Sequence, residues 1–308
     1  MTVKRAVVTG ATGMIGVNLI QQLIERKIEV LAICNPKSSR IQNIPEHSYI
    51  KKIKVSLKEL DQVNEEIKYD ICFHLGWEAT SNCQRNAIEI QESNIAYTLK
   101  AIHMAKRLGC HSFIGGGSQA EYGRKSSPLN GEMAVHPENA YGIAKYTAGR
   151  LGEGLAKQLG LRYIWTRILS VYGPGDGKNT MISYVIRELL EGREPKLTLG
   201  EQIWDYIYCE DAARALLLIG EYGHNQKIYC IGSGHTRTIK EYVECIRDRI
   251  NPKLELNFGT KPYSEEQVMY LCADISELTR DTGFEPQIRF EEGCEKTIHY
   301  CRNQMKKG

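Results

Sequence analysis

The sequence lacks several features that would place it in a specialised class of protein. It has no run of about 18 apolar residues, so no transmembrane helix is expected. Its 40 lysines and arginines are interspersed with 37 aspartates and glutamates, which leaves no basic stripe, and neither nucleic acid nor a membrane is expected as a partner. Its ten cysteines include no Cys-x-x-Cys pair, and several lie in apolar runs, so we expect reduced core cysteines and no metal site.

The start of the chain shows no charged-then-apolar signal, because it enters a strand-like segment at once. We therefore expect a cytoplasmic protein. A length of 308 residues, with 42% hydrophobic and 25% charged residues, is enough for one large domain and a smaller lobe.

The first segment has the pattern of strand, glycine turn and helix. Residues 5–9 form a short apolar run typical of a buried parallel strand, and a helical stretch reaches about Arg26. Between them stand Gly10, Gly13 and Gly16, which permit a tight turn, close approach of the backbone to a pyrophosphate, and close packing of helix against strand. With a strand before it and a helix after it, the pattern predicts a dinucleotide-binding fold.

The end of the next strand, residues 29–34, bears on which dinucleotide is bound. An acidic residue there would accept a hydrogen bond from the ribose 2′-hydroxyl of NAD, but Asn35 stands in that place. Lys37, Ser38 and Arg40 follow, and they supply cations and hydroxyl donors suited to the 2′-phosphate of NADP. The sequence favours NADP(H), with NAD(H) as the alternative cofactor. The same turn also fits an ordinary solvated loop with surface charges.

Two more apolar segments bring polar residues to the carboxyl edge of the expected sheet. Residues 69–76 have the composition of a buried strand that runs into a loop at Trp77, where ligands bind in such sheets. His74 is expected to be a hydrogen-bonded strand-end histidine. A long helix is expected over about 86–108, followed by a strand at 111–114.

Three glycines at 115–117 follow the last of these strands, and Ser118 comes next. The glycines are expected to leave room for a flat ring beside the backbone. Tyr141 and Lys145 lie four residues apart, which puts both side chains on one face of a helix. A tyrosine near a fixed positive charge should have a pKa below its usual value of about 10 and exchange a proton near neutral pH. Taken alone, this spacing also fits an amphipathic surface helix.

These motifs occur together and in order, and by them the chain resembles the extended short-chain dehydrogenase/reductases, the family of nucleotide-sugar epimerases, dehydratases and reductases. Further matching pieces are His74-Leu75-Gly76, Asn94, Tyr122-Gly123, Arg167 to Pro174, Asp205 to Asp211 and Ile231 to Gly234. The resemblance covers most of the chain. It implies a doubly wound parallel α/β sheet, the Rossmann fold. It also implies that Ser118 orients the substrate oxygen, that Tyr141 is the acid/base, and that Lys145 holds the nicotinamide ribose and lowers the tyrosine pKa.

The residues after Ser118 separate the subclasses of this family. Sugar 4,6-dehydratases that resemble this chain carry an Asp-Glu pair directly after the Ser or Thr, and here those places hold Gln119 and Ala120. Elimination of water then lacks its acid/base pair, and Glu121, one residue later, is expected to point elsewhere. Two activities stay open: reduction of a keto group, expected at C4 of a nucleotide-activated deoxy sugar, and 4-epimerisation. A cofactor-sensing protein without catalysis is the alternative from another class.

The second half of the chain is expected to supply a smaller, discontinuous C-terminal substrate lobe. We expect a dinucleotide-binding domain over 1–174 with a return segment at about 205–233. The substrate-binding lobe is expected over 175–204 and 234–308. In the resembling family two long helices, here at about 86–108 and 139–157, pack against their copies, so we expect a homodimer.

The expected substrate lobe lacks the usual side chains that bind a substrate diphosphate. The family usually has Asn where Ser170 stands, and related epimerases often have Arg where Trp204 stands. Because guanidinium groups match phosphate oxygens bidentately, this is a gap in the nucleotide-sugar interpretation. Lys261 or Arg237 is considered in their place.

The expected site residues fall into three groups. The catalytic residues are expected to be Ser118, Tyr141 and Lys145. The cofactor is expected to contact Gly10, Thr12, Gly13, Met14, Ile15, Gly16, Asn35, Lys37, Ser38, Arg40, Leu75, Gly76, Tyr141, Lys145 and Ile168. The substrate is expected to contact Trp77, Ser118, Gln119, Ala120, Ser170, Asn179, Trp204 and Lys261. The sugar, the nucleotide base and the product stereochemistry stay open, because pocket shape is built from loops that periodicity does not constrain.

Overall fold

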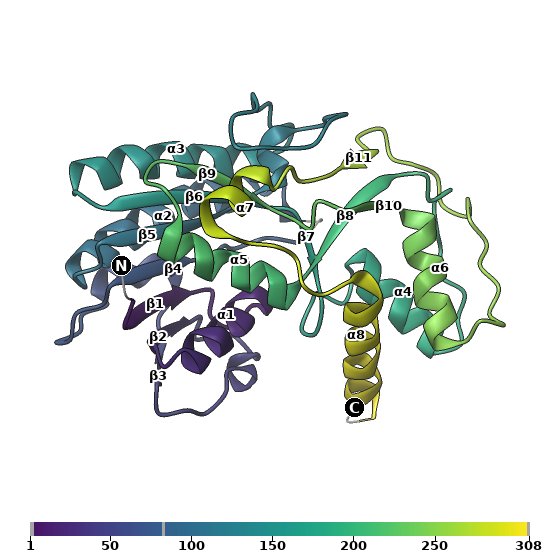
Figure 1. Cartoon of the computed structure of the whole chain (residues 1–308), viewed down its shortest axis with the longest axis horizontal. Helices are drawn as coiled ribbons and strands as arrows, with labels where there is room; N and C mark the ends of the chain where they lie inside the picture. Colours follow the sequence, from purple (N-terminus) through teal and green to yellow (C-terminus); the bar gives the residue numbers. More distant parts are fainter. Residues whose placement is uncertain (1–2, 82–83, 307–308) are drawn as a thin grey trace.

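The computed structural model describes residues 3–81 and 84–306. A large parallel sheet with helices on both faces forms one part of the molecule, and a smaller lobe lies beside it (Figure 1). Within these residues no helix has both the length and the apolar character that a bilayer span requires.

The large part is built on a seven-stranded sheet in the order β3-β2-β1-β4-β5-β6-β9, in which every pair is parallel. Its strands are β1 Arg5–Thr9, β2 Glu29–Cys34, β3 Ile50–Lys54, β4 Ile71–His74, β5 Ser112–Ser118, β6 Arg162–Ile168 and β9 Ile228–Ile231. The strand order reverses between β1 and β4, which creates the switch point where such sheets bind ligands. The expected doubly wound α/β fold is confirmed.

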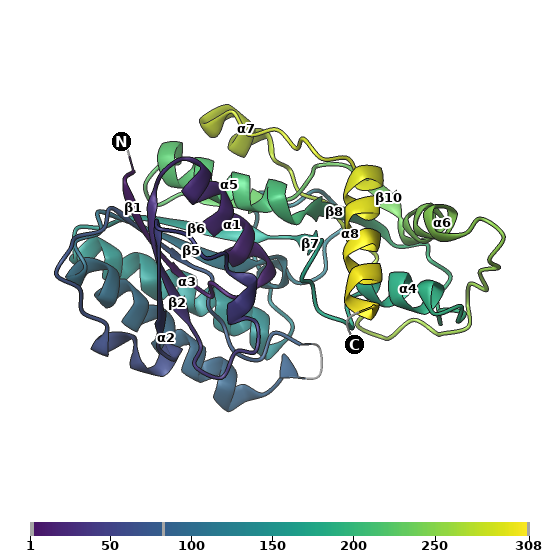
Figure 2. The same cartoon turned by 90° about the horizontal axis from the view of Figure 1, so that it is seen from below.

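Helices cover both faces of this sheet (Figure 2). One face carries α1 Met14–Glu25, α5 Cys209–Tyr222 and α7 Ser276–Thr282, and the other carries α2 Ile88–Arg107 and α3 Ala140–Gln158. Short 3-10 helices lie in the connections, and those of the described residues include η1 Ile41–Asn43, η2 Leu57–Gln62 and η4 Gln119–Tyr122.

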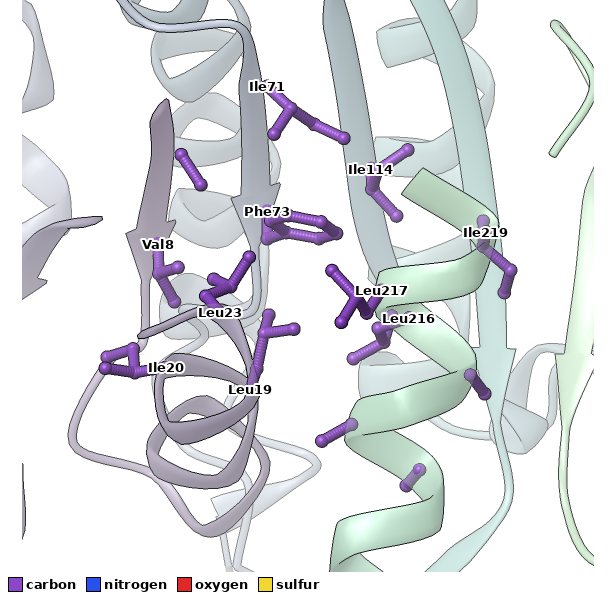
Figure 3. Close-up of a cluster of buried hydrophobic side chains, with 14 of the residues drawn as sticks. Val8, Leu19, Ile20, Leu23, Ile71, Phe73, Ile114, Leu216, Leu217 and Ile219 are labelled. Carbon is purple, nitrogen blue, oxygen red and sulfur yellow. The ribbon is translucent and has the colours of Figure 1, made fainter. Parts of the chain in front are cut away.

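The strands are apolar on both faces because both faces are buried. Successive side chains of a strand point to opposite sides, so Val8 packs toward α1 and α5 while Val7 packs toward α2. Figure 3 shows the first of these two cores, to which β4 contributes Phe73, α1 contributes Leu19 and α5 contributes Leu217. Burial of these apolar side chains on both faces holds the strand ends, and the loops that follow them, in fixed positions.

The smaller lobe has its own sheet and its own core. Its strands are β7 Ser170–Tyr172, β8 Ile203–Tyr208, β10 Thr236–Thr238 and β11 Tyr270–Leu271, and its helices are α4 Met181–Leu190, α6 Ile239–Ile250 and α8 Phe290–Met305. Aromatic rings fill the centre: the ring of Phe290 lies 5.0 Å from that of Tyr172 and 4.5 Å from that of Tyr242, centroid to centroid. The lobe is thus a packed body with its own apolar centre.

The structure divides the chain at different residues from those expected. Because β7 pairs with β8 in the smaller sheet, the first stretch of the large part ends with β6 at Ile168 and not at 174. Because β8 belongs to the lobe, the return to the main sheet begins with α5 at Cys209 and not at about 205. Leu278 and Phe284 pack in the core of the large part, so α7 and its end lie on the Rossmann side and not in the lobe expected over 234–308.

The glycines at 115–117 have a different use from the one expected. They lie inside β5, which runs on to Ser118, so the strand is longer than the expected 111–114. A Cβ placed on Gly115 would meet the ring of Trp165, and one on Gly117 would meet both Trp165 and Glu121. The flat ring beside these glycines is therefore the protein's own Trp165 on the neighbouring strand β6.

Candidate active site

The glycine turn between β1 and α1 forms one wall of the candidate site. Gly10 has φ +68°, and a Cβ there would lie 2.6 Å from the carbonyl carbon of Leu75, at the end of the adjacent strand β4. A Cβ on Gly16 would meet the carbonyl oxygen of Gly10, so only glycine lets the helix approach the strand this closely. The Gly76 amide donates to Thr9 Oγ1 at 3.2 Å, which joins the ends of β1 and β4.

The N-terminus of α1 is open for an anion. Gly13 is its N-cap residue and offers no side chain to the first turn, which begins with Met14, Ile15 and Gly16. Free amides at a helix N-terminus, together with the helix dipole, attract phosphate groups. The glycine turn and this helix end fit the pyrophosphate of a dinucleotide.

The turn after β2 carries two exposed cations. Neither Lys37 nor Arg40 forms an ion pair with any other residue that the structure describes. Ser38 connects this turn to the glycine turn, since its hydroxyl donates to Thr12 Oγ1 at 3.1 Å and accepts from the Arg40 amide. Asn35 Oδ1 accepts from the Lys37 amide at 2.9 Å. The backbone is held while both cationic side chains extend into solvent.

Helix α3 brings the tyrosine and the lysine to the end of β5. Its N-cap is Asn139, whose side chain accepts from the Gly142 amide at 2.8 Å. Tyr141 and Lys145 follow in the first two turns, and both are buried, with 7% and 5% of their surface exposed. Lys145 Nζ donates to the Gly116 carbonyl at 2.5 Å, and Tyr141 is hydrogen bonded to Ser118. The three expected catalytic residues thus lie together at the end of β5.

The titration behaviour of this cluster differs from the expectation. Burial raises the pKa of Tyr141, and the Arg85 guanidinium and the Ser118 hydroxyl only partly offset this. Burial lowers the pKa of Lys145 to about 7. The expectation that Lys145 lowers the tyrosine pKa is therefore wrong for this geometry. The Lys145 ammonium points to the Gly116 carbonyl, and desolvation dominates both groups.

Trp77 covers the lysine from the β4 side. Its ring centre lies 3.8 Å from Lys145 Nζ, a cation–π contact, and 6.1 Å from the Tyr141 ring in an edge-on arrangement. The indole Nε1 donates to Gln91 Oε1 at 2.9 Å, so the ring is held from α2. Asn94 of the same helix binds both the amide and the carbonyl of Glu78, which fixes the loop after Trp77.

Two charged residues beside the site were not assigned to it from the sequence, Arg85 because it was not noticed and Glu121 because it was expected to point elsewhere. Arg85 lies with its guanidinium carbon 4.9 Å from the Tyr141 ring centre, and no sequence pattern pointed to it. Glu121 is fully buried and forms an ion pair with Arg167 at 2.9 Å. Serine followed by glutamate three residues later is the capping-box pattern, which could have revealed Glu121. The Glu121 carboxylate is held in the interior by the Arg167 guanidinium.

The other residues near the end of β5 lie close to Ser118. Gln119 and Ala120 are the first residues of η4, and Gln119 is half-buried while Ala120 is buried. Ile168 is the register partner of Ser118 on β6. His74 Nδ1 shares a hydrogen bond of 2.8 Å with Thr9 Oγ1, and burial lowers the pKa of His74 to about 3, in agreement with a structural role.

The substrate residues expected in the second half of the chain already have partners or lie exposed. Trp204 Nε1 donates to Ser170 Oγ at 2.8 Å, so these two side chains satisfy each other across β7 and β8. Asn179 is exposed before α4, and Lys261 is exposed in the loop between α6 and β11. Arg237 is paired with Glu291 at 2.6 Å, so its charge is already neutralised.

Comparisons with known proteins agree with this arrangement. Residues 6–232 match the model of the NAD dependent epimerase/dehydratase family. The dTDP-4-dehydro-6-deoxyglucose reductase of Escherichia coli is 26% identical over 313 residues, with 96% of each chain covered.

Two solved structures are similar over nearly the whole chain. The UDP-glucose 4-epimerase of Thermotoga maritima with UDP-glucose has a TM-score of 0.89 at 25% identity, covering 98% of this chain and 99% of that one. The UDP-N-acetylglucosamine 4-epimerase of Methanobrevibacter ruminantium M1, in complex with UDP-N-acetylmuramic acid, has a TM-score of 0.89 at 26% identity, covering 99% and 100%.

Proposed function

This chain belongs to the NAD-dependent epimerase/dehydratase family, and we propose that within it the protein is an NADP-dependent oxidoreductase that reduces the C4 keto group of a nucleotide-activated deoxy sugar. The observation that carries the proposal is the buried cluster of Ser118, Tyr141 and Lys145 beside a phosphate-binding glycine turn. Gln119 and Ala120 stand where a dehydratase needs acids, which leaves hydride transfer as the chemistry the site supports.

Each residue of the cluster has a role in such a reduction. The nicotinamide cofactor supplies the hydride when bound. Tyr141 donates its proton to the carbonyl oxygen as that oxygen becomes an alcohol, and the Ser118 hydroxyl donates a hydrogen bond to the same oxygen. The raised pKa of Tyr141 keeps its proton in place at neutral pH, as an acid requires. Burial of all three residues excludes water from the proton transfer.

The choice of NADP rests on the turn after β2. Asn35 replaces the acidic residue that NAD-binding proteins use for the ribose, and the side chains of Lys37 and Arg40 have no ion-pair partner among the described residues. A 2′-phosphate would pair with these cations, whereas the 2′-hydroxyl of NAD finds no carboxylate. The similar reductase of Escherichia coli supports the choice of a 4-keto-6-deoxy sugar as substrate.

A 4-epimerase is the second candidate, favoured by the similarity to the Thermotoga maritima enzyme. An epimerase uses the same residues twice, first to oxidise the C4 hydroxyl and then to return the hydride to the other face. It keeps its cofactor between turnovers, whereas a reductase releases the oxidised cofactor each time. A non-catalytic cofactor-binding protein would have no need of Ser118, Tyr141 and Lys145 together.

We also propose that the protein is a homodimer joined through α2 and α3. Three large apolar side chains are exposed on these two helices: Ile88 at 67%, Ile143 at 50% and Leu151 at 51%. Burying them against a second copy would remove apolar surface from water. Sedimentation at micromolar concentration should give a dimer, and a monomer there would remove this proposal.

The experiment that tests the function is a product assay. The purified protein is incubated with NADPH and a panel of nucleotide 4-keto-6-deoxy sugars, and separately with UDP-glucose and NAD. The proposal predicts NADPH oxidation with one of the keto sugars and formation of a C4 alcohol. Epimerisation of UDP-glucose without net cofactor consumption would favour the second candidate instead.

A further inference from the structure

The interior of the large part holds a buried ion pair. A contribution to folding stability does not explain why this pair is there. Glu121 is 0% exposed and Arg167 is 3% exposed, and Arg167 Nε donates to Glu121 Oε2 at 2.9 Å. A second nitrogen of the same guanidinium, Nη1, is buried without a hydrogen-bond partner among the described residues. Desolvating two charges costs about as much as their attraction returns, so such a pair is weak evidence of stabilisation.

The other oxygen of the Glu121 carboxylate contacts both Ser118 of the candidate active site and the neighbouring Trp165. Its Oε1 accepts from the Ser118 amide at 2.9 Å and from Trp165 Nε1 at 3.0 Å. In return the Ser118 hydroxyl accepts from the Ala120 amide at 3.2 Å. Glu121 and Ser118 therefore cap η4 reciprocally, and the backbone of Ser118 is fixed where β5 ends.

The space for this carboxylate is built into the neighbouring strands. A Cβ on Gly117 would collide with Glu121 Oε1, so glycine at this position admits the side chain. Arg167 is held on the other side, with its guanidinium carbon 4.5 Å from the ring centre of Tyr122. The pair thus connects β5, η4 and β6 directly beneath Ser118, whose hydroxyl is hydrogen bonded to Tyr141.

We propose that Glu121, locked by Arg167, is the positioning residue that holds the Ser118 hydroxyl against Tyr141 and the substrate oxygen. This rests on the proposed function for the roles of Ser118 and Tyr141. Glu121 acts only through Ser118 and through its charge, and it exchanges no proton with the substrate. The negative charge also raises the pKa of both Tyr141 and Lys145, so the same residue affects the pH range of the reaction.

The test compares Glu121→Gln with Glu121→Asp. In Glu121→Gln the charge is lost, so kcat should fall on the order of 100-fold with little change in KM, because a small displacement of Ser118 misaligns the proton donor. The alkaline limb of the kcat profile should also move to lower pH. In Glu121→Asp the charge stays but the side chain is one methylene shorter. The value of kcat should therefore fall, while the alkaline limb of the kcat–pH profile keeps its position. If Glu121→Gln is not recovered folded, Glu121→Asp carries the test through kcat alone.

A double-mutant cycle with Ser118→Ala tests whether Glu121 acts through Ser118. The proposal predicts that Glu121→Gln costs little further activity once the Ser118 hydroxyl is gone. Glu138→Gln is the matched control, because Glu138 pairs with Arg124 at 2.8 Å near the start of α3, does not contact Ser118, and should leave kcat unchanged. Additive losses of activity in the cycle would overturn the proposal. So would a Glu121→Gln enzyme with a lower melting temperature but with unchanged kcat and an unchanged alkaline limb of its kcat–pH profile.

One readout is independent of turnover. Because Glu121 raises the pKa of Lys145, the loss of NADPH affinity at high pH should begin at lower pH in Glu121→Gln than in the wild type. The shift in the pH dependence of NADPH binding is expected even if the protein turns over no keto sugar. The absence of turnover would contradict only the proposed function. An unshifted pH dependence of NADPH binding would contradict the charge effect of Glu121 itself.

Discussion

The candidate site has two ends, the cluster around Tyr141 and Lys145 and the turn after β2, and their charged side chains lie in opposite environments. Ser118, Tyr141 and Lys145 are buried, and their polar groups already have partners: a carbonyl and an indole ring for Lys145, and each other's hydroxyl for Ser118 and Tyr141. At the turn after β2, Lys37 and Arg40 extend into solvent without ion-pair partners among the described residues. The first end is complete before a ligand arrives, and the second is completed only by the ligand.

This difference separates chemistry from cofactor choice. Groups that are preorganised in a dry environment need no rearrangement during the reaction, so changes there should act on kcat and be large. Exposed cations are screened by salt and contribute little each, so changes there should act on affinity and be small. Substitutions at the two ends should therefore differ both in size and in the kinetic quantity they change.

Tyr141→Phe should lower kcat by about 10³-fold, because general acid catalysis contributes on the order of 10²- to 10⁴-fold. NADPH binding should persist, since the ring contact with Trp77 remains. Tyr146→Phe, one turn away on α3, is the matched control and should be unaffected. Steady-state kinetics and a binding titration measure both quantities, and unchanged turnover in Tyr141→Phe would remove the catalytic assignment.

Lys145→Met should weaken NADPH binding by about 10- to 100-fold at pH 6, because a hydrogen bond to a charged group is worth about 1.5–3 kcal/mol. The pKa of Lys145 is lowered to about 7, so the wild type loses this charge, and with it affinity, as the pH rises through that value. The difference between the two proteins should therefore shrink above pH 7. A constant difference from pH 6 to pH 9 would mean that the lysine keeps its charge.

Arg40→Ala and Lys37→Ala should each weaken NADPH binding about fivefold, because an exposed ion pair contributes at most about 1 kcal/mol. NADH, which lacks the 2′-phosphate, serves as the internal control and should bind as before. The losses should be smaller at high salt, where exposed charges are screened. Equal losses for both cofactors would show that this turn does not select between them.

Arg85→Gln should have the smallest effect, a shift of the alkaline limb of the kcat profile to higher pH. The half-exposed guanidinium lowers the pKa of Tyr141, so its removal lets the tyrosine keep its proton longer as the pH rises. Reduction needs the protonated phenol, and activity should extend toward alkaline pH. A shift in the acid direction would mean that Arg85 acts on another group.

The parts of the site that lie within one strand, turn and helix could be predicted from the sequence. Gly10 and Gly16 are needed by a turn and a close helix contact that are local in the chain, and Tyr141 and Lys145 share a face because of helical spacing. Ser118 joins them because a parallel sheet brings the carboxyl ends of its strands to one edge.

The parts that depend on contacts far apart in the sequence could not be predicted. Trp165 fills the space beside Gly115 and Gly117 from another strand. The tyrosine pKa depends on burial and on Arg85, which no spacing indicates. The boundary between the two parts differs from the expected residue 174 because β7 pairs with β8. Strand partners are decided by the whole sheet and not by local composition.

The measurement that tests the account most directly is the titration of the purified protein with NADPH and with NADH, followed by nicotinamide fluorescence, after a check for cofactor that survived purification. The account predicts protein without retained cofactor and a clear preference for added NADPH, as a reductase that exchanges its cofactor in each turnover requires. Retained NAD with no response to NADPH would contradict it, and would mean that the turn from Asn35 to Arg40 does not bind a 2′-phosphate and that the protein is an epimerase.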